Sequence, residues 1–124
     1  MRELAQIFKA LGDETRIKML SLVIRYGELC VCDFEQGMGI SQSKASRHLR
    51  CLANAGLLED RREAVWVYYH LPLKPEAFHK GVAKLVEEAL PQEEFLELET
   101  RFKKWLKSKG CNARIPQRAA QKDK

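Results

Sequence analysis

Long apolar runs are missing from this sequence, and no stretch approaches the roughly 18 apolar residues that a membrane-spanning helix needs. Residues 1–11 intersperse charged among apolar side chains, so they lack the apolar core of a secretory signal. These absences predict a cytoplasmic protein with no membrane partner. A reducing compartment keeps thiols free, so we expect ligands, sensors or packing residues rather than disulfides at Cys30, Cys32, Cys51 and Cys111.

Signals of catalysis are also missing. The sequence contains no catalytic triad, phosphate-binding loop or carboxylate pair, so we expect no enzyme and no organic cofactor. The net charge of +5 is concentrated in residues 101–124, which hold nine of the 22 Lys and Arg residues and one of the 17 Asp and Glu residues. The rest of the chain is therefore slightly acidic, and DNA binding has to be argued from local arrangement rather than from total charge.

Apolar residues at three-four spacing predict four helices in the first half of the chain, over about 2–11, 13–27, 31–37 and 41–54. Asp13 and Ser41 are suitable N-caps for the second and fourth helices. Gly37 and Gly39 are expected to stop the third helix. The third and fourth helices, joined by a glycine-containing turn, form a helix-turn-helix.

The pattern changes after residue 57 to one that is typical of strands. The segment "AVWVYYHL", residues 64–71, is rich in β-branched and aromatic side chains. With "LLEDR" before it and Arg61-Arg62-Glu63 as the turn, it predicts a β-hairpin, which beside a helix-turn-helix is a wing. We therefore predict a mainly α fold with a β-hairpin wing (α+β), a winged helix-turn-helix.

The chain length and the position of its helix-breaking residues predict one compact domain with an extension. Pro91 is expected to break the helix that starts near residue 76, and a further apolar pattern resumes to about Lys107. The predicted units are a winged helix-turn-helix DNA-binding and dimerisation domain, a C-terminal helix packing on that domain and a basic, disordered tail, over residues 1–90, 91–108 and 109–124.

The fourth helix sorts into two faces on a helical wheel. Ala45, Leu49 and Leu52 are expected to face the core. The opposite side and the helix start offer hydroxyl, amide and guanidinium groups without an acidic residue, at Gln42, Ser43, Ser46, Arg47 and Arg50. Such groups bind phosphates and base edges, so they predict a DNA-recognition helix, with Arg62 at the hairpin tip as a further DNA contact. The alternative is that these cations only solvate an exposed face.

Cys30 and Cys32 lie where the third helix begins. Residues i and i+2 of a helix point about 200° apart, so the two side chains cannot hold one ion while residues 30–32 stay helical. Binding of a shared thiophilic ion is therefore expected to unwind that turn and, since the third helix braces the recognition helix, to weaken DNA binding. The alternative is that both cysteines serve as small buried apolar residues.

Four segments together resemble the arsenic-repressor (ArsR/SmtB) family of winged-helix metalloregulators: "LGDETRIKML", "ELCVCD", "SQSKASRHLRCLANAGLL" and "VWVYYHL". "ELCVCD" is similar to the trivalent-arsenic motif of its founding branch. The resemblance implies a homodimeric repressor that leaves double-stranded operator DNA near its resistance genes when arsenite or antimonite binds. It further implies that Cys30 and Cys32 are the arsenic ligands and that DNA is contacted by Gln42, Ser43, Ser46 and Arg47.

The sequence departs from the family pattern in its ligand set. Glu35 stands where the founding branch has a third cysteine, so either two thiolates suffice with a solvent or small-thiol ligand, or Cys51 or Cys111 supplies the third. The zinc-sensing branch has carboxylate and histidine ligands on its last helix, and the weak counterparts here are interpreted as exposed helix surface, at Glu76, His79 and Glu87. The helix over about 92–107 and the tail lie outside the resemblance.

Two apolar helix faces, in residues 4–11 and 82–90, exceed what a small core requires, the second with Val82, Leu85, Val86 and Leu90. Two-fold operators are normally bound by two-fold proteins, so we expect a homodimer; the alternative is that both faces pack within one chain.

Two other functions stay open. The same repressor could sense cadmium, lead or thiol oxidation instead of arsenic. A thiol oxidoreductase or metal-trafficking protein is less favoured, because the pair is C-x-C rather than C-x-x-C.

Overall fold

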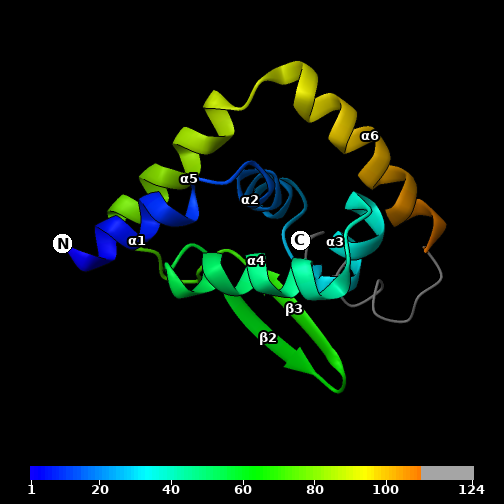
Figure 1. Ribbon diagram of the computed structural model, residues 1–124, viewed down its shortest axis with the longest axis horizontal. Helices are drawn as coiled ribbons and strands as arrows, with labels where there is room; N and C mark the ends of the chain where they lie inside the picture. Colours follow the sequence, from blue (N-terminus) through cyan, green and yellow to red (C-terminus); the bar gives the residue numbers. More distant parts are fainter. Residues whose placement is uncertain (110–124) are drawn as a thin grey trace.

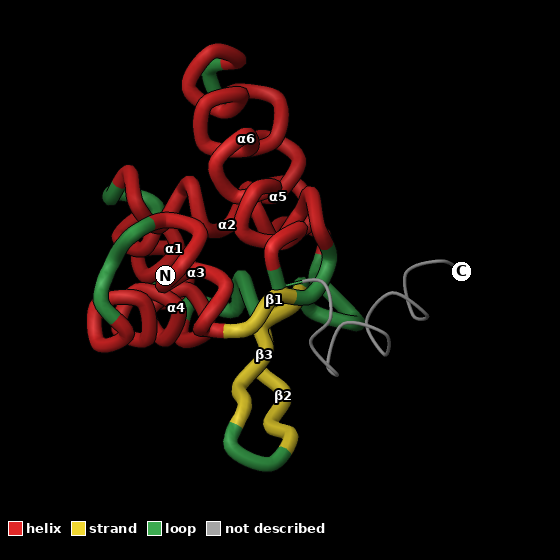
Figure 2. Tube along the Cα trace, turned by 90° about the vertical axis from the view of Figure 1, so that its right-hand side faces the viewer, coloured by secondary structure: helices red, strands yellow, loops and turns green. Residues whose placement is uncertain are grey.

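The computed structural model describes residues 1–109 of the 124-residue chain; Cys111 and all of the predicted tail except Lys109 lie outside the described residues. The elements are α1 (Arg2–Ala10), α2 (Glu14–Tyr26), β1 (Leu29–Cys30), α3 (Val31–Met38), α4 (Gln42–Asn54), β2 (Glu59–Glu63), β3 (Trp66–His70), α5 (Ala77–Ala89) and α6 (Gln92–Ser108). The winged helix-turn-helix is confirmed: α3 and α4 lie together, and the hairpin of β2 and β3 projects away from the helices (Figures 1 and 2). Within the described range, every helix is too short or too polar to cross a membrane.

Helix boundaries follow from side chains that satisfy the free N–H groups of the first turn. The Asp13 carboxylate accepts hydrogen bonds from the N–H groups of Thr15 and Arg16, at 2.8 and 3.3 Å. The Ser41 hydroxyl accepts one from the N–H of Lys44 at 3.1 Å. Both predicted N-caps are confirmed, and they fix where the helices on either side of the turn begin.

Gly37 does not stop α3, contrary to the sequence prediction; it is a buried residue of that helix. A Cβ at this position would lie 2.5 Å from Cδ1 of Phe102, so only glycine lets α6 approach α3 this closely. The helix ends at Gly39, whose φ of 70° is left-handed. A glycine near a helix end usually indicates a terminator, whereas here it serves a contact with a helix more than sixty residues away.

We expect Gly37→Ala to lower the free energy of unfolding by about 1–3 kcal/mol, because the added methyl overlaps the Phe102 ring. Gly81→Ala is the matched control. Gly81 lies in α5, where an added Cβ would have nothing within 4 Å, so alanine should raise stability by about 0.5–1 kcal/mol through helix propensity. Urea unfolding measures both changes. Equal effects at the two positions would contradict the close packing of α3 on α6.

The three strands form an antiparallel sheet in the order β1-β3-β2. β1, which the sequence did not predict, pairs Leu29 with Tyr69 and Cys30 with Tyr68. In the hairpin, Arg62 pairs with Val67, so the predicted Arg61-Arg62-Glu63 turn is wrong and the position of Arg62 at the tip with it. These residues extend β2, and the turn comes at residues 64–65.

The core lies between the helices and one end of the sheet, and it contains the three inward positions predicted for α4, Ala45, Leu49 and Leu52, all 0% exposed. Helix α6 adds a second packing layer on α2 and α3. The ring of Phe102 stacks 5.7 Å from that of Tyr26 and lies 6.0 Å from that of Phe34. Figure 1 shows α5 and α6 as two arms that meet above α2, with α6 descending beside α3.

Candidate functional site

An open groove of about 460 Å³ runs between α4 and the wing, and we call it the recognition groove. Its lining is Val31, Ser43, Ser46, Arg47, Arg50, Arg62, Val67 and Tyr69. The structure thus brings together all but one of the DNA-contact residues that the sequence predicted. The exception is Gln42, which is exposed at the start of α4 and takes no part in this lining.

The arginines of the recognition groove differ in whether an acidic side chain pairs with them. Arg50 is 3.4 Å from a carboxylate oxygen of Asp60 on β2, and its guanidinium lies 6.0 Å from the centre of the Tyr69 ring. Among residues 1–109, Arg47 and Arg62 have no ion-pair partner, and both are exposed. The sequence did not predict the acidic neighbour, because Asp60 reaches the helix through tertiary structure. Arg47 and Arg62 are therefore the cations best placed for a polyanion.

Helix α4 is fixed to the rest of the domain on its inner side. The guanidinium of Arg16 donates to Nδ1 of buried His48 at 3.1 Å and to the carbonyl of Ala10 at 2.7 Å. Burial lowers the pKa of His48, which favours the neutral ring that can accept this bond. The recognition groove is thus preorganised, since its helix is held at a buried residue.

The two cysteines converge, contrary to the geometric prediction. Cys30 is the N-cap of α3 with extended φ and ψ of −86° and 155°, and only Cys32 is helical. The two Sγ atoms are 3.1 Å apart, with the Cys32 thiol donating to the sulfur of Cys30. Pairing of β1 with β3 takes Cys30 out of the helix, so no turn has to unwind for one atom to contact both sulfurs.

The thiol pair lies directly behind the recognition groove. Cys30 is 1% exposed and Cys32 is half-buried, so an incoming species reaches the pair from the side of Cys32. Val31, between them, is 9% exposed and lines the groove. No local pattern in the sequence indicated Val31, the single residue that joins the two sites.

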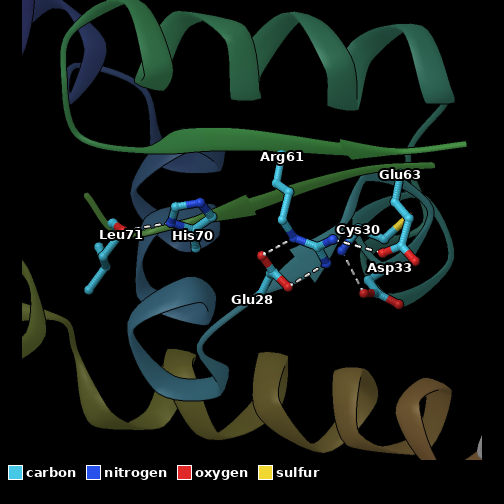
Figure 3. A network of polar contacts seen from close by, with 7 residues as sticks. All are labelled: Glu28, Cys30, Asp33, Arg61, Glu63, His70 and Leu71. Atoms are coloured by element: carbon cyan, nitrogen blue, oxygen red, sulfur yellow. Dashed lines mark hydrogen bonds and ion pairs between the residues drawn. The ribbon is translucent and has the colours of Figure 1, made fainter. Parts of the chain in front are cut away.

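A network of polar contacts lies beside Cys30, and Figure 3 shows Asp33, Arg61, Glu28 and Glu63 around this residue. The Asp33 carboxylate accepts the N–H of Cys30 at 2.8 Å, which completes a capping box at the start of α3. Arg61 of the wing donates to both carboxylate oxygens of Glu28, at 2.9 and 3.1 Å, and bonds Glu63 at 2.7 Å. An acidic residue three positions after Cys30 was the available signal for the cap; nothing local indicated Arg61.

No third protein ligand accompanies the pair in the part of the chain that is described, where no three Cys, His, Asp or Glu residues are grouped to hold a metal ion. Cys51 is half-buried on α4 and packs against the core. His79, expected to be exposed, is half-buried, with Nε2 3.3 Å from the carbonyl of Ala55. The two sulfurs therefore suit a thiophilic species that binds both of them and takes any third ligand from outside residues 1–109.

Comparison with known proteins gives a consistent family. The family described as "Bacterial regulatory protein, arsR family" matches residues 13–60. The chain is 47% identical over 88 residues to the arsenic resistance transcriptional regulator ArsR1 of Pseudomonas putida, covering 68% of this chain and 69% of that protein. It is 45% identical over 84 residues to the arsenical resistance operon repressor of Escherichia coli, with coverages of 68% and 69%.

A solved structure extends the likeness to three dimensions. It is the homodimeric winged helix-turn-helix DNA-binding domain of "a possible ArsR-family transcriptional regulator" from Mycobacterium bovis. The TM-score is 0.60 at 28% identity, and the match covers 73% of this chain and 84% of that chain.

Proposed function

Because the chain belongs to the ArsR family of bacterial regulatory proteins, we propose that it is a homodimeric repressor of arsenic-resistance genes, acting on operator DNA in the cytoplasm. Trivalent arsenic or antimony releases it by binding Cys30 and Cys32. One observation carries this proposal: Val31, between the two thiols, is part of the wall of the recognition groove. A ligand that rearranges the pair must therefore act on the DNA-binding surface.

DNA binding by α4 follows from the recognition groove. A recognition helix enters the major groove and presents its N-terminal residues to base edges, here Ser43, Ser46 and Arg47. Arg62 on the wing is placed for the phosphate backbone, which supplies affinity without sequence information. Because this affinity comes from displaced counterions, it should fall steeply as salt is added.

The chemistry of the pair suits a soft, trivalent species. Arsenous acid, As(OH)₃, condenses with two thiols to form two S–As bonds and releases two molecules of water, leaving one hydroxyl on arsenic. A small thiol can replace that hydroxyl by the same exchange. The convergence of the sulfurs of Cys30 and Cys32 supports this bidentate binding without a third protein ligand.

Release of DNA follows from what is attached to the pair. Cys30 lies opposite Tyr68 of the wing strand β3 in the sheet register, and Val31 lines the recognition groove. Two new bonds to one atom fix the separation of the sulfurs and remove the hydrogen bond between the two thiols, and we expect the backbone of residues 30–32 to adjust. The wall of the groove and the base of the wing then move together, and this coupling replaces the helix unwinding that the sequence predicted.

Dimerisation is supported by apolar side chains left exposed on α1 and α5. Phe8 is 64% exposed and Leu85 is 62% exposed, whereas Val86, included in the predicted surface, is buried at 8%. Exposed large apolar side chains on these two helices are groups that a second copy of the chain would cover. The homodimeric Mycobacterium bovis domain supports the same assignment.

The proposal is tested by binding to the DNA upstream of the protein's own gene, measured by fluorescence anisotropy and by sedimentation of the complex. We expect two chains per operator and an affinity at least about tenfold lower with arsenite, a coupling typical of linked sites. Arsenate, which is pentavalent and not thiophilic, is the control. Unchanged affinity with arsenite would remove arsenic as the inducer.

A second candidate signal is thiol oxidation, which the 3.1 Å separation of the sulfurs favours. Hydrogen peroxide would take two protons and two electrons from the thiols of Cys30 and Cys32 and leave as two molecules of water, with a disulfide formed. A peroxide arm in the same measurement separates the two signals, because an oxidation switch requires no arsenic.

A further inference from the structure

The capping carboxylate behind the thiol pair also binds the C-terminal helix. Asp33 is 0% exposed, and while one oxygen accepts the N–H of Cys30, the other accepts the indole N–H of Trp105 at 3.0 Å. The same oxygen contacts the ammonium group of Lys109, whose side chain is only 4% exposed. One buried carboxylate therefore joins the turn that carries the thiols to the end of α6.

A buried ion pair of this kind adds little net stability, but losing one partner leaves the other charge buried without its counter-charge. Taking two charges out of water costs more than a surface pair returns, so Asp33 and Lys109 are a weak source of net stability. Removing the ammonium takes away the charge that compensates the buried carboxylate, and we expect the carboxylate to turn towards water. The hydrogen bond that the carboxylate makes to Cys30 would be lost with it.

The rest of α6 is placed firmly enough to hold these two groups in position. Phe102 packs on Gly37 of α3, and farther along the helix Glu99 accepts hydrogen bonds from Arg25 at 2.7 Å and Tyr26 at 3.2 Å. Burial, followed by the neighbouring Glu99, raises the pKa of Tyr26 to about 12, so this phenol remains a donor at neutral pH. Helix α6 is thus anchored on both α2 and α3.

We propose that Trp105 and Lys109 are positioning residues for the thiol pair, acting through Asp33 on the backbone N–H of Cys30. They keep Cys30 in its extended N-cap conformation, which directs its sulfur towards Cys32. The assignment of the pair as the inducer site rests on the proposed function; the positioning itself does not. Helix α6, which lies outside the sequence resemblance, thereby acquires a role in setting inducer affinity.

The first test compares Lys109→Met with Lys109→Arg and with Lys104→Met, which removes an exposed lysine of the same helix. Lys109→Met should weaken arsenite binding by about 10–100-fold, the usual effect of losing a group that orients a metal ligand. Lys109→Arg should restore most of the affinity, and Lys104→Met should match the wild type. Operator affinity without arsenite should stay within about twofold in Lys109→Arg and Lys104→Met. In Lys109→Met it is measured separately, because Val31, next to Cys30, lines the recognition groove.

A metal-free readout accompanies the titration. Alkylation of Cys30 by iodoacetamide, a neutral reagent, is followed by mass spectrometry of the peptide that contains both cysteines. We expect alkylation of Cys30, which is 1% exposed in the intact protein, to be several-fold faster in Lys109→Met. Because no arsenic is involved, this result stands even if arsenite does not bind, and it separates failure of the positioning proposal from failure of the proposed function.

A third measurement does not require a substitution in the ion pair of Asp33 and Lys109. The chain has two tryptophans, and Trp66 is a 40% exposed wing residue, so Trp66→Phe leaves Trp105 as the fluorophore. Blocking the thiols, with arsenite or with iodoacetamide, should change the Trp105 emission. Unchanged emission, or a Lys109→Met protein with wild-type alkylation and arsenite affinity, would overturn the proposal.

Discussion

Replacing Cys30 with serine should leave operator binding intact and remove the response to arsenite. The hydroxyl of serine is a hard donor, so the bidentate S–As–S bridge cannot form, although Cys32 can still bind arsenic weakly. We expect inducer affinity to fall by more than the roughly 10–100-fold that accompanies loss of an outer-shell partner. Anisotropy of a labelled operator, titrated with arsenite, measures both the retained repression and the lost release.

Cys32→Ser should give the same result, because each sulfur supplies one of the two bonds. The matched control is Cys51→Ser, a change at a half-buried cysteine on α4 that packs against the core rather than beside the pair. Cys51→Ser should respond to arsenite like the wild type. If Cys30→Ser still dissociates at wild-type arsenite concentrations, the pair is not the inducer site, whatever the family likeness suggests.

Much of the fold could be predicted because its determinants are local. The apolar spacing and the N-caps Asp13 and Ser41 lie within one turn of the helices they define, and the strand signal of β3 is continuous in sequence. The exceptions were set by distant partners. Gly37 has the local pattern of a helix stop but serves a contact with Phe102, and Cys30 has the local pattern of a helical residue but pairs with Tyr68.

The candidate site divides in the same way. Periodicity on a single helix was enough to place Ser43, Ser46 and Arg47 on one face. The partners of Asp33 could not be found by pattern, because Trp105 and Lys109 are 72 and 76 residues away. The geometric prediction for the thiols failed for a related reason: it was valid for a helix, and the sheet had removed Cys30 from one.

Arg47→Ala should weaken operator binding by about 1–3 kcal/mol, which is roughly 5–150-fold. Arg47 is exposed in the recognition groove and, among residues 1–109, has no ion-pair partner, so its charge is available to DNA. The slope of log affinity against log salt should fall by about one if Arg47 contacts a phosphate. If Arg47 instead reads a base, the loss should be larger on the operator than on unrelated DNA.

Lys104→Ala is the control, since it removes an exposed cation from α6, a helix that contributes nothing to the recognition groove. It should leave both the affinity and the salt slope unchanged. Asp60→Asn tests the groove from the other side: without the carboxylate that now holds Arg50, both the repulsion of phosphate and the competing ion pair disappear, and affinity should rise. Equal losses for Arg47→Ala and Lys104→Ala would mean that net charge, rather than the face of α4, carries DNA binding.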